Sequence, residues 1–150
     1  RGDFTLGEAV DNFEKRFAQK IGAKEAIGVA SGTDAIFLSL NALGAGDEVL
    51  VPTFTFYATI GAIVTSGATP VFVDSGADFN IDASLLEASI TEKTKAIVPV
   101  HWSGKPCDMD VIENVAKKYN LFIVEDACHS ITASYKGRPS GTYRSRDYTK

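Results

Sequence analysis

The sequence of 150 residues has few of the features that mark disulfide-stabilised or membrane proteins. Its two cysteines, Cys107 and Cys128, are too few and too widely separated for a disulfide framework, and neither belongs to a CxxC pair. No apolar stretch approaches the ~20 residues of a membrane span, and the N-terminus lacks a charged-then-apolar signal pattern. We therefore expect a cytoplasmic protein with free thiols and no membrane partner.

Clustered positive charge is also scarce. The chain has 15 lysines and arginines against 19 aspartates and glutamates, a formal net charge of −4, and its basic residues gather only between Arg138 and Arg146. A nucleic acid is therefore not expected as a partner. The two histidines and the scattered carboxylates show no metal-ligand spacing, so no metal site is expected either.

Apolar residues, in contrast, are plentiful. They make up 45% of the chain, which is enough for one substantial core. Short apolar runs alternate with helical patterns, and this order is typical of an α/β fold with a mostly parallel sheet between helices. Expected strands cover residues 26–30, 48–51, 71–73, 96–100 and 121–124.

Each expected helix has a recognisable start or end. One helix follows Gly7 and ends at Gly22, with apolar residues at helical spacing between them. Others cover 33–43, 57–65 and 83–89, the last capped by Asp82. Asp108 caps a further helix with these residues expected to point inward: Val111, Ile112, Val115, Ala116 and Tyr119. The polar segment 135–150 departs from this alternation.

The end of the last expected strand carries two carboxylates and a histidine. Glu125 and Asp126 follow the apolar run 121–124, and His129 lies three residues further on. Because ligands of parallel sheets bind at the carboxyl ends of strands, Asp126 is expected to face a cationic group, with a simple turn cap as the alternative. Glu125 points to the opposite face, where we expect a surface or subunit contact.

The turn at residues 30–35 joins an expected strand to a helix. Its small residues let backbone N–H groups approach an anion, and the hydroxyls of Ser31 and Thr33 add donors, so a phosphate monoester fits. An ordinary helix N-cap made by either hydroxyl explains the same residues.

Other phosphate motifs do not match. Gly104-Lys105-Pro106 has neither the upstream glycine nor the following hydroxyl of a Walker loop, and Gly28 and Gly32 do not fit GxGxxG. Nicotinamide binding is therefore disfavoured.

Rings gather at two further strand ends. In the segment 52–57, one aromatic ring is suited to cover a flat heteroaromatic ligand, although core packing is the preferred interpretation for Phe54 and Tyr57. His101 follows an apolar run, and a hydrogen-bonded packing role is favoured over catalysis. No serine lies in a GxSxG elbow, so a serine hydrolase has no support.

Taken together, an anion-binding turn, a flat aromatic ring and a carboxylate at three strand ends match the needs of pyridoxal 5′-phosphate. Several ordered blocks lie between Phe4 and Gly141, at residues 13–14, 30–35, 46–49, 52–56, 67–74, 94–97 and 125–127. In these blocks the chain resembles the DegT/DnrJ/EryC1/StrS family of sugar aminotransferases.

This resemblance implies the three-layer αβα large domain of fold-type-I, pyridoxal-phosphate-dependent transferases. It also implies a homodimer with sites between subunits, and a role in cell-surface polysaccharide or antibiotic sugar biosynthesis. The expected reaction moves an amino group from a donor such as glutamate to a nucleotide-linked ketosugar.

The resemblance also assigns residues to the cofactor. It implies that Gly32, Thr33 and Asp34 hold the phosphate, that Phe56 stacks on the pyridine ring, and that Asp126 bonds the ring nitrogen. A carboxylate there stabilises the protonated ring, so Asp126 is expected to be catalytic. His129 falls where the family has Gln or His beside the cofactor, and it is grouped with Asp126 as a catalytic candidate.

The family's cofactor-bonding lysine lies in a Ser-Phe-x-x-x-Lys segment, and residues 1–150 contain no such segment. Lys150 comes too early after Asp126 to take that role. We therefore expect residues 1–150 to be part of the large domain, without the small C-terminal domain, unless the terminal segment is rearranged. Two alternatives remain: a sugar dehydratase of the same family, in which histidine replaces lysine, and a non-catalytic sugar-phosphate-binding or assembly module.

Overall fold

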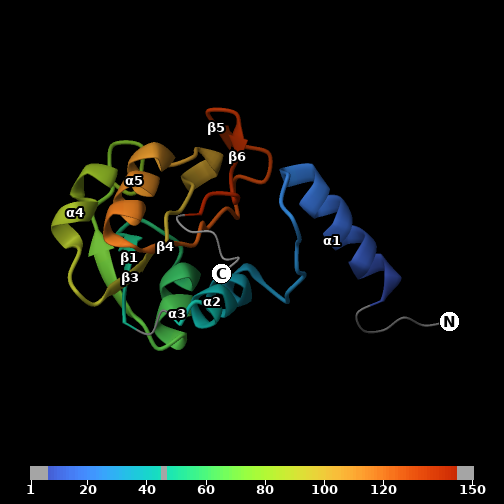
Figure 1. The fold of residues 1–150 in the computed structure, drawn as a ribbon, viewed down its shortest axis with the longest axis horizontal. Helices are drawn as coiled ribbons and strands as arrows, with labels where there is room; N and C mark the ends of the chain where they lie inside the picture. The colour runs from blue at the N-terminus through green and yellow to red at the C-terminus, as the bar shows by residue number, and fades with distance from the viewer. Residues whose placement is uncertain (1–6, 45–46, 145–150) are drawn as a thin grey trace.

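A four-stranded parallel sheet forms the centre of the molecule (Figure 1). The structure is a computed structural model that describes residues 7–44 and 47–144. The strands lie in the order β2-β1-β3-β4, and every neighbouring pair is parallel. Their bounds are Glu48–Pro52 for β1, Thr69–Val73 for β2, Thr94–Ile97 for β3 and Phe122–Ile123 for β4.

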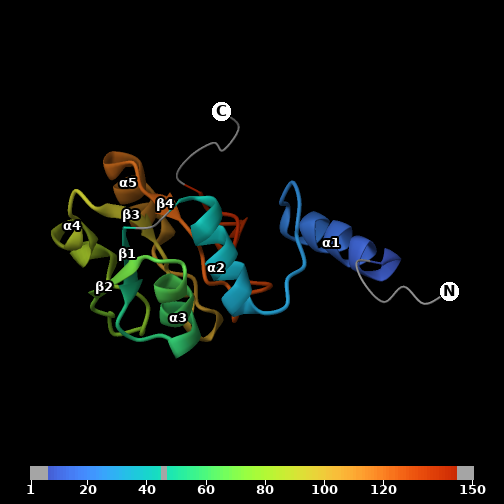
Figure 2. The same cartoon turned by 90° about the horizontal axis from the view of Figure 1, so that it is seen from below.

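Helices cover both faces of this sheet. α2 (Gly32–Ala42) and α3 (Tyr57–Thr65) pack on one face, where Val49 and Val51 of β1 are buried. α4 (Leu86–Ser89) and α5 (Met109–Tyr119) pack on the other, against Leu50. Figure 2 shows these two helical layers on either side of the strands. Because side chains alternate along a strand, β1 supplies both halves of the core, and the expected three-layer αβα arrangement is confirmed.

Short elements complete the described chain. The turn Ala83–Leu85 is a 3₁₀-helix that leads into α4, and Trp102–Gly104 forms another short 3₁₀ turn after β3. β5 (Ser134–Tyr135) and β6 (Arg138–Pro139) pair as an antiparallel hairpin. Residues 134–143, which comprise this hairpin and the residues that follow it, are called the hairpin segment below. None of the helices within the described residues is long and apolar enough to cross a bilayer.

The expected helix caps are present. The Asp82 carboxylate accepts a hydrogen bond from the Ser84 N–H at 3.0 Å, and the Asp108 carboxylate accepts one from the Val111 N–H at 3.4 Å. α5 ends at Asn120 in the left-handed conformation, with φ of 59°. These side chains and turns satisfy backbone groups that have no partner inside a helix, and the expected caps at Asp82 and Asp108 are confirmed.

The expected strand at residues 26–30 is wrong. This segment is extended but pairs with none of the described strands, and Ile27 and Val29 are 80% and 41% exposed. It connects α1 (Glu8–Ile21), which stands away from the sheet, to α2 (Figure 1). An apolar run forms a strand only when a neighbour completes its backbone hydrogen bonds. Here the Gly28 N–H instead donates to the Glu14 carboxylate at 2.5 Å.

The inward face of α5 is narrower than the sequence predicts. Ile112, Val115 and Ala116 are buried, but Val111 and Tyr119 are 36% and 37% exposed, so the prediction is wrong for these two. Both lie at the margins of the buried stripe, and the Tyr119 hydroxyl donates to Glu87 at 2.9 Å across the surface. A polar tip that reaches water or a surface partner explains why tyrosine suits such a margin.

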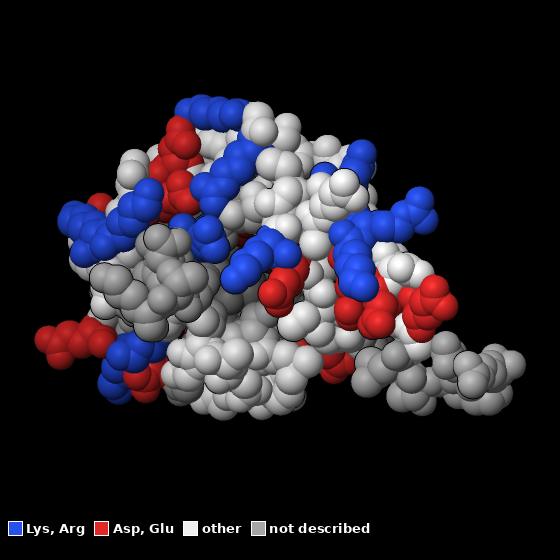
Figure 3. Space-filling model, turned by 45° about the vertical axis from the view of Figure 1, so that its right-hand side comes forward, with Lys and Arg blue, Asp and Glu red and all other residues white. Residues whose placement is uncertain are grey.

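Charges of both signs are interspersed on the face shown in Figure 3. Lys105 and Asp78 form an exposed ion pair at 2.8 Å, and Lys118 and Glu87 form another at 2.6 Å. Exposed pairs of this kind contribute little to stability, typically about 0–1 kcal/mol.

We predict that Leu50→Ala lowers the free energy of unfolding by about 2–5 kcal/mol, because the fully buried Leu50 side chain lies in the core between β1 and the α4–α5 layer. Chemical denaturation of the purified protein measures this change. Val64→Ala on α3 is the control, since Val64 is 54% exposed and its loss is expected to stay within about 0.5 kcal/mol. Equal effects of the two variants would contradict the assignment of this core.

Candidate functional site

A pocket of about 230 Å³ lies at the carboxyl ends of β1, β3 and β4. Four separate segments line it: the start of α2, the connection from β1 into α3, and the turns that follow β3 and β4. Because parallel strands bring their carboxyl ends to one edge, residues far apart in the sequence meet here. The lining residues are Gly32, Thr33, Ile36, Thr55, Phe56, Ala58, Thr59, Val100, His101, Trp102, Asp126, Cys128 and His129.

Five of the six residues that the sequence assigns to a cofactor line this pocket: Gly32, Thr33, Phe56, Asp126 and His129. Asp34 does not line it. The Asp34 carboxylate accepts a hydrogen bond from the Ser31 hydroxyl at 2.9 Å, and the Asp34 N–H donates to the Ser31 oxygen at 3.1 Å. The structure therefore brings five of the six predicted residues together. Asp34 takes part in the helix cap instead, and a contact between Asp34 and a ligand stays a prediction.

The start of α2 has features of both sequence interpretations, the helix N-cap and the turn that an anion could approach. Ser31 is the N-cap, as the simpler interpretation predicts, while Gly32 and Thr33 face the pocket. The first N–H groups of a helix have no intrahelical partner, and the helix dipole favours an anion beside them. A Cβ atom at Gly32 would lie 3.2 Å from the Cys128 Sγ, so a glycine lets this turn approach the far wall closely.

Hydrogen bonds fix both the side chain and the backbone of Asp126. Its side chain is buried, with the residue 8% exposed, and Oδ2 accepts a hydrogen bond from the Thr59 hydroxyl at 2.7 Å. Oδ1 accepts one from the Cys128 N–H at 3.3 Å. The Asp126 N–H donates to the Pro99 carbonyl at 2.9 Å, which continues the β3–β4 pairing beyond the strands. The carboxylate is thus fixed at the pocket wall. Its bond to the Cys128 N–H is also the turn cap that the sequence offered as the alternative role of Asp126.

Thr59 is a site residue that sequence reasoning missed. It lies in the first turns of α3, it is 1% exposed, and its hydroxyl also accepts a hydrogen bond from the Thr55 hydroxyl at 3.1 Å. The available signal was a threonine one turn after Thr55, where the helix that follows β1 starts. A threonine in an apolar helix needs a partner for its hydroxyl, and here the partner is Asp126.

The aromatic residues after β1 divide into different environments. Phe56 is 60% exposed and lines the pocket, with its ring centroid 4.5 Å from that of Tyr57. Tyr57 is 76% exposed, so its expected core packing is wrong, because it lies at the first position of α3 and points outward. Phe54 packs on Trp102 at 4.6 Å and on Phe79 at 5.0 Å, but it is 43% exposed and belongs to neither core cluster, so its expected core packing is wrong as well.

The turn that carries Trp102 lies directly against the His129 loop. Gly104 has φ of +84°, and a Cβ atom there would be 2.8 Å from the His129 carbonyl oxygen. This approach requires glycine both for its backbone conformation and for its lack of a side chain. It brings the Trp102 and His129 rings to 5.7 Å, edge to face, at one wall of the pocket.

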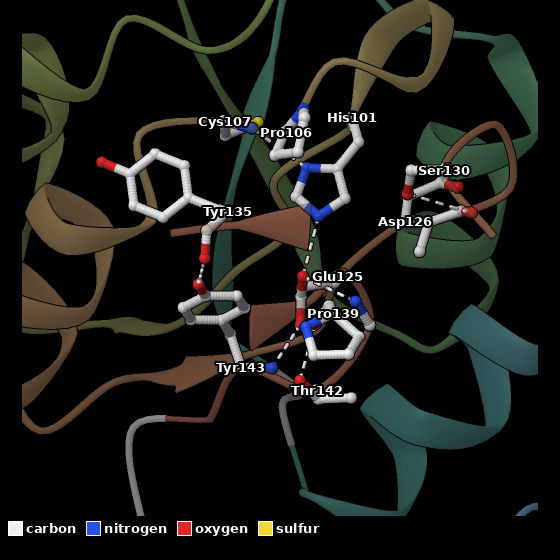
Figure 4. Close-up of polar contacts among 12 residues, drawn as sticks. His101, Pro106, Cys107, Glu125, Asp126, Ser130, Tyr135, Pro139, Thr142 and Tyr143 are labelled. Carbon is white, nitrogen blue, oxygen red and sulfur yellow. Dashed lines mark hydrogen bonds and ion pairs between the residues drawn. The ribbon is translucent and has the colours of Figure 1, made fainter. Parts of the chain in front are cut away.

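The surface or subunit contact expected for Glu125 is wrong, because its carboxylate is buried and bonded within the chain. Its side chain is 2% exposed and lies 2.7 Å from the His101 Nε2 (Figure 4). As predicted, Glu125 points away from the Asp126 side, but the hairpin segment covers that face and buries it. The favoured packing role of His101 agrees with its position, since the ring is buried and accepts a hydrogen bond from the Cys107 N–H at 3.2 Å.

Both cysteines are free thiols, as expected. Burial raises the pKa of the Cys107 thiol to about 12. Partial burial and the neighbouring Asp126 carboxylate raise the pKa of the Cys128 thiol to about 11. Both thiols are therefore protonated at neutral pH, so neither is activated as a nucleophile. Among the described residues, no group of three or more His, Cys, Asp and Glu side chains is placed to hold a metal ion.

Several curated proteins are similar to this chain. The spore coat polysaccharide biosynthesis protein SpsC of Bacillus subtilis is 47% identical over 144 residues, which cover 94% of this chain and 37% of SpsC. The GDP-perosamine synthase of Caulobacter vibrioides is 47% identical over 141 residues, which cover 92% of this chain and 38% of the synthase. The chain thus spans less than two fifths of the length of these relatives.

Solved structures share the fold. DesV of S. venezuelae, in complex with a ketimine intermediate, superposes with a TM-score of 0.87 at 43% identity, covering 89% of this chain and 37% of DesV. NtdA of Bacillus subtilis, with bound cofactor PMP, gives a TM-score of 0.86 at 40% identity, covering 90% of this chain and 32% of NtdA. These similarities confirm the fold expected from the sequence.

The family is established by a match over nearly the whole chain. The model of the DegT/DnrJ/EryC1/StrS aminotransferase family matches residues 1–148. This range includes the start of α2, the β1–α3 connection and the strand end at Asp126, which together form the pocket. The chain therefore belongs to the DegT/DnrJ/EryC1/StrS aminotransferase family.

Proposed function

We propose that this chain is the cofactor-binding part of the large domain in a pyridoxal-phosphate-dependent sugar aminotransferase. The reaction would move an amino group from an amino acid such as glutamate to a nucleotide-linked ketosugar. The observation that carries the proposal is the buried Asp126 carboxylate, fixed at the wall of a pocket that also contains Gly32, Thr33 and Phe56.

The residues of the pocket fit this cofactor. The start of α2 offers N–H groups and the Thr33 hydroxyl to a phosphate, and Gly32 leaves room for a close approach. The exposed ring of Phe56 is available to cover a flat heterocycle. When bound, pyridoxal 5′-phosphate supplies the electron sink for amino-group transfer. Asp126 would hold the proton at the ring nitrogen, Thr59 would keep the Asp126 carboxylate oriented, and His129 would close one side of the site.

The names of similar proteins support the substrate class. They include a GDP-perosamine synthase, a dTDP-3-amino-3,6-dideoxy-alpha-D-galactopyranose transaminase and a UDP-2-acetamido-2-deoxy-3-oxo-D-glucuronate aminotransferase. The sugar carriers differ among them, so the proposal specifies a nucleotide-linked sugar and not one nucleotide. A cytoplasmic homodimer with sites between subunits is part of the same proposal. The exposed side chains of Phe56 and Tyr57 are apolar surface beside the pocket that a second subunit would cover.

The deciding experiment uses the full-length protein with pyridoxal 5′-phosphate. We expect an absorbance band of the covalently bound cofactor that disappears when the candidate lysine is replaced. A histidine at that position would instead favour the dehydratase. Affinity for a nucleotide sugar without any affinity for the cofactor would favour a non-catalytic binding module. The Lys150 position lies outside the described residues.

Asp126→Asn is predicted to lower kcat by at least ~10²-fold while weakening cofactor binding much less, because it removes the charge that keeps the ring nitrogen protonated but retains the size of the side chain. Steady-state kinetics and cofactor titration measure the two effects separately. Asp110→Asn is the control, since Asp110 pairs with Lys136 at the surface, outside the pocket. A loss of affinity with an unchanged kcat would argue against the assigned role.

Thr33→Val is predicted to have the opposite profile. Loss of one hydrogen bond to a charged phosphate is expected to raise the Kd for the cofactor ~10-fold, with kcat at saturating cofactor nearly unchanged. Ser39→Ala on the same helix is the control, because the Ser39 hydroxyl donates to the Ala35 carbonyl at 2.7 Å and is not part of the pocket. Should kcat fall without a change in Kd, Thr33 would not be a phosphate ligand.

A further inference from the structure

The Glu125 carboxylate is buried between three hydrogen-bond donors (Figure 4). Its Oε2 lies 2.7 Å from the His101 Nε2 and accepts a hydrogen bond from the Gly141 N–H at 2.8 Å. Its Oε1 accepts one from the Tyr143 N–H at 2.5 Å. A buried carboxylate is costly unless it is fully bonded, and these donors supply that compensation. Glu125 and Asp126, which follow β4, are called the β4 end below. Through Glu125, the turn after β3 and the hairpin segment are both bonded to the β4 end.

The two hydrogen-bond partners of the His101 ring indicate which ring nitrogen carries the proton. Its Nδ1 accepts a hydrogen bond from the Cys107 N–H at 3.2 Å, which places the ring proton on Nε2 and makes Nε2 the donor to Glu125. The His101 side chain is fully buried, so this bond is shielded from solvent. The His101 N–H also donates to the Asp126 carbonyl at 3.2 Å. The turn after β3 is therefore bonded to two consecutive residues of the β4 end.

These bonds bear directly on Asp126, because Glu125 and Asp126 are adjacent in an extended segment. Side chains of neighbouring residues in such a segment point to opposite faces, and the Val100–Asp126 bridge shows that the pairing extends this far. The bonds of the Glu125 carboxylate therefore restrain, from one face, the same backbone that aims Asp126 into the pocket on the other face. Gly141 also packs beneath this loop, since a Cβ atom there would be 3.6 Å from the Ala127 Cβ.

We propose that Glu125 is a positioning residue of the site: its buried carboxylate clamps the hairpin segment and His101 against the strand end, and thereby fixes the orientation of Asp126. This inference rests on the proposed function. The Asp126 carboxylate accepts hydrogen bonds from the Thr59 hydroxyl and from the Cys128 N–H, and both of these residues line the pocket. Glu125 supplies the restraint from the opposite face.

The chain contains a matched control for this clamp. Glu113 on α5 holds the same hairpin segment through an ion pair with Arg138 at 2.9 Å, whereas the Glu125 carboxylate bonds both this segment and His101. Glu113→Gln therefore loosens the hairpin segment alone. Glu125→Gln keeps the size of the side chain but points an amide N–H₂ at groups that are themselves donors, so it disrupts the clamp.

The test compares these variants in the full-length protein by amide hydrogen exchange and by the circular dichroism of bound pyridoxal 5′-phosphate. For Glu125→Gln we expect faster exchange at residues 126–128, reduced cofactor dichroism and a kcat lower by ~10–100-fold, as when the support of a site residue is removed. For Glu113→Gln we expect faster exchange only within residues 138–143, with the dichroism and kcat of the wild type.

The inference is overturned if Glu125→Gln leaves exchange at 126–128 and the dichroism unchanged, or if Glu113→Gln reproduces both changes. Should Glu125→Gln not fold, His101→Gln and His101→Leu form a second pair, because the glutamine amide can still donate to Glu125 and leucine cannot. Equal amide exchange at residues 126–128 in the two His101 variants would also overturn the inference. The exchange measurement needs no cofactor, so it stays decisive even if the wild type binds none, a result that would count against the proposed function alone.

Discussion

The parallel pairing of β3 with β4 is the constraint on which the rest of the site depends. This pairing continues past the strands through the Asp126 N–H to the Pro99 carbonyl and the His101 N–H to the Asp126 carbonyl. It brings the turn after β3 and the turn after β4 to the same edge, next to the β1–α3 connection. A shift in this register would move His101 and Asp126 relative to each other, and both residues line the pocket.

The last residues of the β4 end place two acids on opposite faces, and each is buried for a different reason. Asp126 lines the pocket and accepts a hydrogen bond from the Thr59 hydroxyl. Glu125 faces the hairpin segment and is bonded by three donors of the protein itself. Burial without a partner would be unfavourable for either group. Two adjacent carboxylates therefore have different surroundings: one lines a pocket, and the other is bonded entirely within the protein.

Local sequence signals were sufficient for most of the fold. The helix caps at Asp82 and Asp108 and the apolar runs of the four paired strands depend on neighbouring residues, and the structure confirms them. The segment 26–30 has the same apolar pattern, yet it has no strand beside it among the described residues. Strand formation needs a partner that the run itself does not specify, which is why this prediction failed.

The misplacement of Glu125 and the omission of Thr59 have a similar origin. Alternation along the strand correctly put Glu125 opposite Asp126, but only the tertiary fold shows that residues 134–143 cover that face. Thr59 lies 67 positions before Asp126, and nothing in the sequence between them indicates their hydrogen bond. Five residues that line the pocket could be predicted from strand ends and from the family resemblance, whereas the supporting residues Thr59 and Glu125 could not.

The exposure of Phe56 connects the shape of the site to its proposed use. A phenylalanine that is 60% exposed at a pocket leaves apolar surface in water, and full burial of such a side chain is worth about 1.5–3 kcal/mol. Packing within the described residues leaves most of Phe56 exposed, at the N-cap position of α3. A flat ligand ring laid on Phe56 would recover part of that free energy while its charged ends meet the α2 start and Asp126. The pocket thus combines the apolar ring of Phe56 with the polar groups of Thr33 and Asp126, and a phosphorylated pyridine would need both kinds of group.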